Sequence, residues 1–311
     1  MSSSIRSVKF QNYDMYWNIS AKIYLPQDFN ESNKYPAIIS CHPIGGCKEQ
    51  TASLYASAIS KEGFVVIAYD ASFQGESGGI LRSIEDPSLR VEDIRHVVDY
   101  LVTLAYVDEN RIGILGICGG GGYSINAIMT ERRIKAIGTI SAVNYGRLMR
   151  GNFSKLNPIP LIEEMCKQRT IEARGGKQRI DYIVPPSMEI LKKSGINDSD
   201  LYEATSYYRT DIAQHPNAVS QNLFSHNAIS LSWDSFHLAE VLLTQPILSI
   251  AGGKVGSFGS YRDSSEIIER ARSDKKELVL LDGISHVDLY YKPEAVEKAL
   301  AKLVPFYKEN L

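Results

Sequence analysis

Apolar runs of strand length alternate with helical patterns along most of this chain, and that alternation limits the folds open to it. The runs at 35–41 and 64–69 are apolar almost throughout, as strands that are covered on both faces should be. In chain order the predicted strands span 35–41, 64–69, 112–117, 134–140, 246–251 and 277–281, and the predicted helices span 49–61, 88–105, 119–131, 234–243, 263–272 and 293–308. Because parallel strands need crossover connections, the pattern predicts an α/β fold with a mainly parallel sheet and helices on both faces.

Two parts of the chain depart from this alternation. Residues 5–11 and 18–25 predict an opening antiparallel pair of strands. Between 144 and 232 the alternation stops, and charged, tyrosine-rich helical pieces separated by prolines replace it. We therefore expect an α/β body made of residues 1–143 and 233–311, with residues 144–232 inserted as a helical cap.

Composition excludes several classes of partner. The 311 residues carry 34 basic and 36 acidic side chains, with no run of like charge that would grip nucleic acid. The apolar runs are far shorter than the roughly 20 residues that cross a bilayer, so we expect no membrane span. The N-terminus lacks the features of a secretory signal, which favours the cytoplasm. Four cysteines without disulfide-framework or zinc spacing predict reduced thiols, no metal and no cofactor. The oligomeric state stays open, a homodimer included.

The strand at 112–117 runs directly into Cys118 and four glycines that begin a helix. Such a turn holds a nucleophile in a strained backbone conformation, usually with serine where this chain has cysteine. Gly116 and Gly120 flank the turn and must be small, because backbone passes close by. The helix N-terminus is expected to favour the Cys118 thiolate. A nucleotide-binding glycine loop is the alternative, but this segment has no Gly-x-Gly-x-x-Gly spacing.

A second candidate segment of the functional site, Ser40 to Gly46, follows the first buried strand. In an enzyme with this kind of turn, the backbone N–H of Ile44 joins that of Gly119 to form an oxyanion hole. His42 lies in the same run, and we expect it to be a buried structural histidine bonded to backbone.

The general base of such a fold comes last in chain order, just past the final strand. His286 stands there, before the closing helix. His96 lies on the polar side of a helix, and the histidines at 215, 226 and 237 lie in or beside the cap. We therefore predict His286 as the base that serves Cys118.

These motifs resemble those of the α/β hydrolases over nearly the whole chain. More narrowly, they are similar to the branch that holds dienelactone hydrolases, acetyl-xylan esterases and the fungal polyketide transferases. The matching runs occur in the expected order at residues 42–46, 48–50, 70–79, 90–95, 116–121, 207–210, 215–217 and 286–290. The resemblance implies acyl chemistry on an ester, thioester or lactone, with an acid as the third member of a catalytic triad.

The acid is the point at which this sequence departs from the family pattern. It often follows the penultimate strand, and the expected position holds Gly256. The candidates are Asp263 and Asp234, each also a plausible helix N-cap, and Asp70, which would otherwise bond to loop backbone. A thiol can also form an activated pair with histidine without the acid that a serine would need.

The sequence as a whole predicts acyl transfer through a covalent Cys118 thioester, with His286 handling the proton and release of the acyl group to water or another acceptor. The partner is then a small-molecule acyl substrate. The aromatic residues of the cap either line an apolar pocket for this substrate or only pack the cap onto the body. These residues are Tyr202, Tyr207, Tyr208, Phe224 and Trp233. Two other functions stay open: a non-catalytic binding module with this fold, and a redox-sensing thiol at Cys118.

Overall fold

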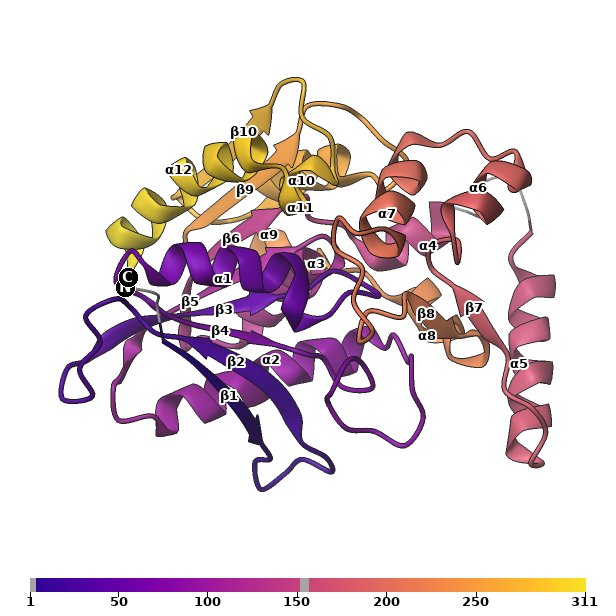
Figure 1. Ribbon diagram of the computed structural model, residues 1–311, viewed down its shortest axis with the longest axis horizontal. Helices are drawn as coiled ribbons and strands as arrows, with labels where there is room; N and C mark the ends of the chain where they lie inside the picture. Colours follow the sequence, from indigo (N-terminus) through magenta and orange to yellow (C-terminus); the bar gives the residue numbers. More distant parts are fainter. Residues whose placement is uncertain (1–3, 152–156) are drawn as a thin grey trace.

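The computed structural model describes residues 4–151 and 157–311. Within these residues an eight-stranded sheet has the order β1-β2-β4-β3-β5-β6-β9-β10 (Figure 1). The strands are β1 (Ile5–Phe10), β2 (Ile19–Tyr24), β3 (Tyr35–Cys41), β4 (Val65–Tyr69), β5 (Val107–Ile117), β6 (Ile134–Ile140), β9 (Ile247–Gly252) and β10 (Lys276–Leu281). β2 is antiparallel to β1 and β4, and the remaining neighbours are parallel. The predicted mainly parallel sheet with an antiparallel opening pair is confirmed.

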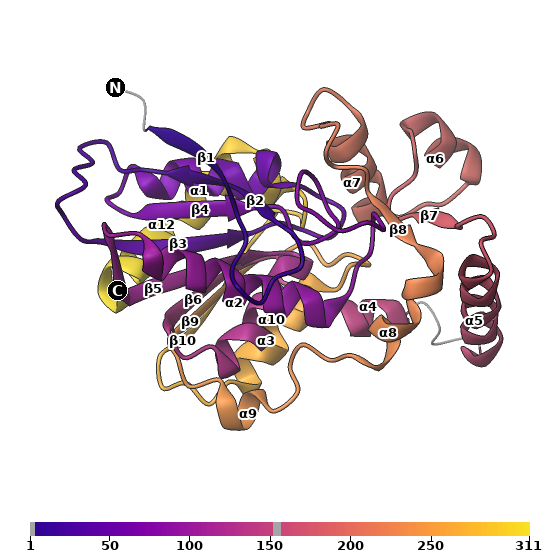
Figure 2. The same cartoon turned by 90° about the horizontal axis from the view of Figure 1, so that it is seen from below.

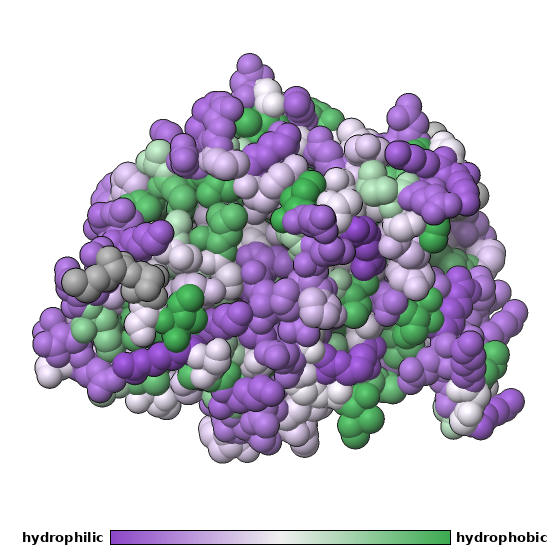
Figure 3. Space-filling view, in the orientation of Figure 1, coloured by the Kyte–Doolittle hydropathy of each residue, from purple (hydrophilic) through white to green (hydrophobic). Residues whose placement is uncertain are grey.

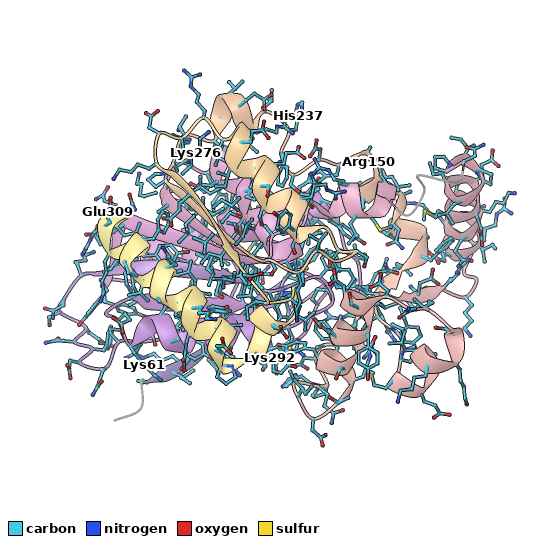
Figure 4. All side chains as sticks on the ribbon, turned by 90° about the horizontal axis from the view of Figure 1, so that it is seen from above. Lys61, Arg150, His237, Lys276, Lys292 and Glu309 are labelled. Atoms are coloured by element: carbon cyan, nitrogen blue, oxygen red, sulfur yellow. The ribbon has the colours of Figure 1, made fainter. Side chains whose placement is uncertain are left out.

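Helices cover both faces of the sheet, as predicted (Figure 2). One face packs against α1 (Ser53–Ser60), α11 (Asp288–Tyr291) and α12 (Pro293–Asn310), and the other against α2 (Pro87–Thr103), α3 (Gly119–Thr130), α9 (Ala239–Leu242) and α10 (Ser260–Arg270). Local chemistry sets their ends. Asp86, for example, begins α2 by accepting hydrogen bonds from the N–H groups of Ser88 and Leu89, with Pro87 at the first helical position. In Figure 4 the labelled Lys292 and Glu309 mark the two ends of α12, and Lys292 is the end nearer the cap.

The structure corrects the predicted helix at 234–243 and the suggested N-cap roles of Asp234 and Asp263. The helix expected at 234–243 is reduced to α9, because Asp234 accepts a hydrogen bond from the Phe236 N–H in a turn and Leu238 has a φ of 63°. Asp234 is therefore not a helix N-cap. Asp263 is not one either, because α10 already begins at Ser260.

The chain leaves the sheet after β6 and returns to it at β9, and we call residues 144–232 the cap. In Figure 1 its helices stand to one side of the sheet. Its elements are α4 (Tyr145–Gly151), α5 (Ile159–Ala173), β7 (Ile180–Tyr182), α6 (Met188–Ser194), α7 (Ser199–Arg209), β8 (Gln221–Leu223), η2 (Phe224–His226) and α8 (Ala228–Ser232). The small antiparallel sheet of β7 and β8 was not expected from the sequence. Residues 152–156 of the predicted cap and 1–3 of the predicted body lie outside the described residues.

Polar side chains cover most of the face of the molecule in Figure 3, and apolar groups are scattered among them. Among the described residues, no helix combines the length and apolar character that a bilayer crossing requires.

A buried ion cluster fixes the chain just after β3, in the short π-helical segment η1 (Lys48–Ala52). The Lys48 side chain is 1% exposed, and its Nζ lies 2.7 Å from Asp70 Oδ2, 2.8 Å from Glu49 Oε1 and 2.7 Å from Glu76 Oε2. Asp70 also accepts hydrogen bonds from the N–H groups of Lys48 and Glu76. A Cβ at Gly75, where φ is 47°, would lie 2.2 Å from Asp70 Cγ, so this position requires glycine. The Asp70 carboxylate is thus engaged in holding this loop.

Replacing Asp70 by alanine should lower the free energy of unfolding by about 3–5 kcal/mol, because Lys48 would lose its buried partner. Urea unfolding followed by circular dichroism measures this. The matched control is Glu31→Ala, which breaks the exposed Arg6–Glu31 pair and should cost less than about 1 kcal/mol. Equal losses in the two variants would contradict a structural role for the buried cluster.

Candidate active site

Cys118 occupies a sharp turn between β5 and α3. Its φ of 55° and ψ of −123° lie outside the regions that non-glycine residues prefer. A Cβ at Gly116 would lie 2.5 Å from the Gly121 Cα, and a Cβ at Gly120 would lie 2.6 Å from the carbonyl oxygens of Cys41 and His42. The prediction that Gly116 and Gly120 must be small is therefore confirmed. The turn exposes the Cys118 side chain to a cavity, although only 9% of the residue is accessible.

The two residues predicted to form an oxyanion hole lie against each other beside Cys118. A Cβ at Gly119 would lie 2.3 Å from Ile44 Cδ1, so glycine lets the Ile44 side chain pack against the backbone at position 119. The Gly119 N–H also lowers the pKa of the Cys118 thiol. Ile44 also lines the cavity that Cys118 faces.

A buried network supports the loop that carries Ile44. His42 Nδ1 lies 2.7 Å from the Pro43 carbonyl oxygen, and its Nε2 accepts a hydrogen bond from the Ala71 N–H. The Arg90 guanidinium donates to the His42 carbonyl oxygen at 2.8 Å. Burial, and then the charge of Arg90, hold the pKa of His42 well below its usual value. The prediction of a buried structural histidine is confirmed.

His286 follows β10, as predicted, and its ring is held by two hydroxyl groups. Nδ1 lies 2.9 Å from Ser260 Oγ, and Nε2 lies 2.9 Å from Tyr290 Oη. Tyr290 lies beside Cys118 as well: both residues line the same cavity, and the Tyr290 hydroxyl lowers the pKa of the Cys118 thiol. Tyr290 is therefore a neighbour of both Cys118 and His286. Both partners of the imidazole are hydroxyl groups, and the tautomer in which Nδ1–H donates to Ser260 leaves Nε2 able to accept from the Tyr290 O–H.

Burial keeps both groups neutral in this structure. It raises the pKa of the Cys118 thiol to about 11, and this outweighs the smaller lowering effects of the Tyr290 hydroxyl and the Gly119 backbone N–H. It lowers the pKa of His286 to about 3. The Gly119 N–H at the helix N-terminus lowers the pKa of the thiol, as expected, but burial outweighs this effect and the thiol is neutral.

The three candidate acids are engaged elsewhere. Asp263 accepts hydrogen bonds from the Asn144 N–H and the Arg147 guanidinium, and Asp234 accepts one from the Asn144 side-chain amide. Asp70 belongs to the ion cluster after β3. Among the described residues, His286 Nδ1 has the Ser260 hydroxyl as its hydrogen-bond partner and no carboxylate.

A cavity of about 570 Å³ separates the cap from the body in front of Cys118. Its body side includes Ile44, Cys118, Phe258 and Tyr290. The cap side is largely apolar and is formed by Leu148, Met149, Leu161, Met165, Ile183, Val184, Ile196, Leu201, Tyr208 and Phe224, among others. Its shape and lining suit a small molecule with an apolar part.

The five cap aromatics fall into two groups. Tyr208 and Phe224 line the cavity, as the pocket hypothesis requires. Tyr207 is buried against Tyr208 and accepts a hydrogen bond from the Thr51 N–H, so it packs the cap onto the body. Trp233 packs against Tyr123, and Tyr202 is 49% exposed.

One cluster of metal-ligating types lies outside the cavity lining. The side chains of Cys47, Glu49 and His215 offer ligand atoms within 4.8 Å of one another. Two of the three have partners within the protein: Glu49 Oε1 pairs with Lys48, and His215 Nδ1 accepts a hydrogen bond from the Asn217 N–H.

Sequence reasoning missed Tyr290 and Ser260. Tyr290 stands four residues after His286, at the spacing that brings side chains together when the chain turns helically, and this was a usable signal. Ser260 begins α10, and nothing in its local sequence points to His286.

Comparison with known proteins identifies the family of this chain. A model of the dienelactone hydrolase family matches residues 19–207, more than half of the chain. The chain belongs to the dienelactone hydrolase family. The resemblance predicted from the motifs is confirmed, and so, at the level of the family, is a hydrolase or related acyltransferase.

Relatives of this dienelactone hydrolase family member match over nearly its whole length. Protein YcjY of Escherichia coli (strain K12) is 44% identical over 299 residues, which cover 94% of this chain and 95% of YcjY. The crystal structure of protein PA2218 from Pseudomonas aeruginosa superimposes with a TM-score of 0.89 at 29% identity, and the match covers 100% of this chain and 94% of that one. A thiohydrolase of Eupenicillium brefeldianum is 20% identical over 291 residues, 91% of this chain and 88% of its own.

Alkylation of Cys118 by iodoacetamide should rise with pH, roughly tenfold per unit, toward its pKa of about 11, because the thiolate is the nucleophile. Peptide mass mapping in a Cys166→Ser background measures the rate without the exposed cysteine. Cys118→Ala is the control that identifies the adduct. A rate that levels off below the ~8.5 of a free cysteine would contradict a buried neutral thiol.

Proposed function

We propose that this protein transfers acyl groups through a covalent thioester on Cys118. One observation carries the proposal: Cys118, on its strained turn, lines a largely apolar cavity together with Tyr290, whose hydroxyl lies 2.9 Å from His286 Nε2. The proposed nucleophile Cys118 thus faces a cavity that a substrate can enter, and Tyr290 offers a route for its proton to the proposed base His286.

In the first step the Cys118 sulfur attacks the carbonyl carbon of the substrate. The thiol proton passes to Tyr290 Oη while the Tyr290 proton passes to His286 Nε2. The electron pair of the carbonyl bond moves onto its oxygen, which the N–H groups of Ile44 and Gly119 stabilise. When the tetrahedral intermediate collapses, the bond to the leaving group breaks, and the imidazolium proton returns through Tyr290 to that group.

The second step releases the acyl group. Water, or another acceptor with a hydroxyl, amine or thiol, gives its proton to His286 and attacks the thioester carbonyl carbon. Collapse of this intermediate breaks the bond to sulfur, and the proton from His286 restores the Cys118 thiol.

The neutral resting pair favours this order of events. With the pKa of Cys118 raised and that of His286 lowered by burial, the proton moves during the attack rather than before it. A buried, protonated thiol is also a poor target for oxidants, which react with exposed thiolates. These properties favour acyl transfer over redox sensing.

The substrate is an ester, thioester or lactone whose acyl part is largely apolar. The cap side of the cavity, with Leu201, Tyr208 and Phe224, supports that choice. The relative from Eupenicillium brefeldianum that carries the name thiohydrolase supports thioesters within this set.

Incubation with p-nitrophenyl butyrate should leave an acyl adduct on Cys118, visible by intact-mass spectrometry, and Cys118→Ala should lower turnover at least ~10³-fold. Alanine fits the turn, so thermal unfolding should be unchanged. Adduct formation without turnover of any ester or thioester would instead indicate a binding module. Wild-type rates in Cys118→Ala would exclude a cysteine nucleophile.

Tyr290→Phe should lower kcat roughly 10²-fold or more, because the hydroxyl that connects Cys118 to His286 would be gone. Tyr291→Phe is the matched control, since it removes a hydroxyl from the next residue in the chain. Unchanged turnover in Tyr290→Phe would show that the thiol and the imidazole meet directly, and the proton path through Tyr290 would be abandoned.

A further inference from the structure

The loop after β9 has a gap where the family pattern places an acid, and a carboxylate from the cap occupies it. A Cβ at Gly256 would lie 2.0 Å from Asp200 Oδ1 and 2.2 Å from its Cγ. The Asp200 carboxylate thus stands where the side chain of an acid at position 256 would begin. Glycine at 256 and aspartate at 200 exclude anything larger from that space.

Asp200 is held in this position by the loop itself. It is the second residue of α7, is 3% exposed, and its Oδ2 accepts a hydrogen bond from the Phe258 N–H at 2.8 Å. One residue before α7, the Asp198 side chain accepts hydrogen bonds from the Ser257 hydroxyl and the Leu201 N–H. Two carboxylates at the start of α7 therefore attach the cap to residues 256–258.

The same loop carries the groups that hold the His286 ring. The Phe258 ring packs edge-on against the imidazole, with centroids 5.2 Å apart. Ser260, two residues farther on, lies 2.9 Å from His286 Nδ1. The Asp200 charge also acts on the nucleophile, since it is among the causes, after burial, that raise the pKa of Cys118.

Among the described acids near His286, Asp200 is a buried carboxylate whose partner is the Phe258 N–H rather than a cation. Asp288 pairs with Lys292 at 2.6 Å, and Glu203 accepts a hydrogen bond from the Ser285 hydroxyl. Among the described residues, no lysine, arginine or histidine forms an ion pair with Asp200. A buried carboxylate without a cation is costly, unless a positive charge arises nearby during function.

We propose that Asp200 of the cap is the acidic positioning residue of this site, in place of the carboxylate that the body lacks at Gly256. The inference rests on the proposed function, in which His286 becomes an imidazolium at each step. Asp200 stabilises that cation by its field, and it orients the ring through the loop that bears Phe258 and Ser260. The catalytic site is then complete only with the cap in place, so the element that walls the cavity also activates the base.

Relocating the charge tests this assignment. Asp200→Asn should lower kcat at least ~10-fold, with KM changed less, and Gly256→Asp alone should also be impaired because its Cβ meets the Asp200 carboxylate. The double variant Asp200→Ala with Gly256→Asp should recover activity relative to Asp200→Ala, because it returns the acid to the body. Asp211→Asn, an exposed cap acid bonded to Gln214, is the matched control and should keep wild-type kcat.

The pH profile separates positioning from a merely structural role. Loss of the Asp200 charge should move the limb of kcat that reports His286 to lower pH, because the imidazolium loses stabilisation. The other titratable groups around the two residues are Cys118, Tyr290, Asp198 and Glu203, and none of them is altered in Asp200→Asn. Wild-type kcat and profile in a folded Asp200→Asn variant would overturn the proposal.

If Asp200→Asn does not fold, the double variant Asp200→Ala with Gly256→Asp tests the proposal instead. Activity of this variant would support an acid moved to position 256, and a folded but inactive variant would overturn the role of Asp200. Cys118→Ala, assayed in parallel with p-nitrophenyl butyrate, distinguishes the two levels of inference. Wild-type turnover there would remove the proposed function and the role of Asp200 with it, whereas an inactive Cys118→Ala beside a fully active Asp200→Asn would remove only the latter.

Discussion

The positive φ of Cys118 is the constraint on which the site depends. A non-glycine residue in such a conformation costs about 1–3 kcal/mol and persists only where its surroundings enforce it. Here the Cys118 N–H donates to the Ile140 carbonyl oxygen at the end of β6, and the Cys118 carbonyl oxygen accepts from the Val143 N–H, both at 2.9 Å. The neighbouring strand therefore holds the turn open, and the glycines around it let the loop after β3 approach.

That loop is in turn fixed by charges that the body buries beneath it. Lys48 and Asp70 hold its far end, and Arg90 with His42 holds its near end. Both arrangements use groups that would be expensive to leave unpaired, so the loop is specified strongly. The backbone N–H of Ile44 stands on this rigid support, which is what a preorganised oxyanion site needs.

The cap contributes more than a wall to the cavity. Tyr207 attaches it to the body at the Thr51 N–H, and His215 contacts Cys47 with 3.6 Å between Nδ1 and Sγ. α7 is attached to the loop after β9 through Asp198 and Asp200. Direct polar contacts at several points thus hold the cap to the loops after β3 and β9, and a movement of the cap would displace Phe258, which packs against the His286 ring.

The sequence by itself determined the body: strands, helices and the turn at Cys118 follow from local periodicity and glycine spacing, which act within a few residues. It also placed His286 after the last strand, because topology orders the catalytic loops along the chain. Only the tertiary structure decided the protonation states of Cys118 and His286, since burial depends on what covers a group. It alone decided that Tyr290 stands between them and that Asp200 fills the space at Gly256, because residues from distant segments meet there. The sequence reveals an absent acid at one position, but the carboxylate that occupies its place becomes visible only when the cap is folded against the body.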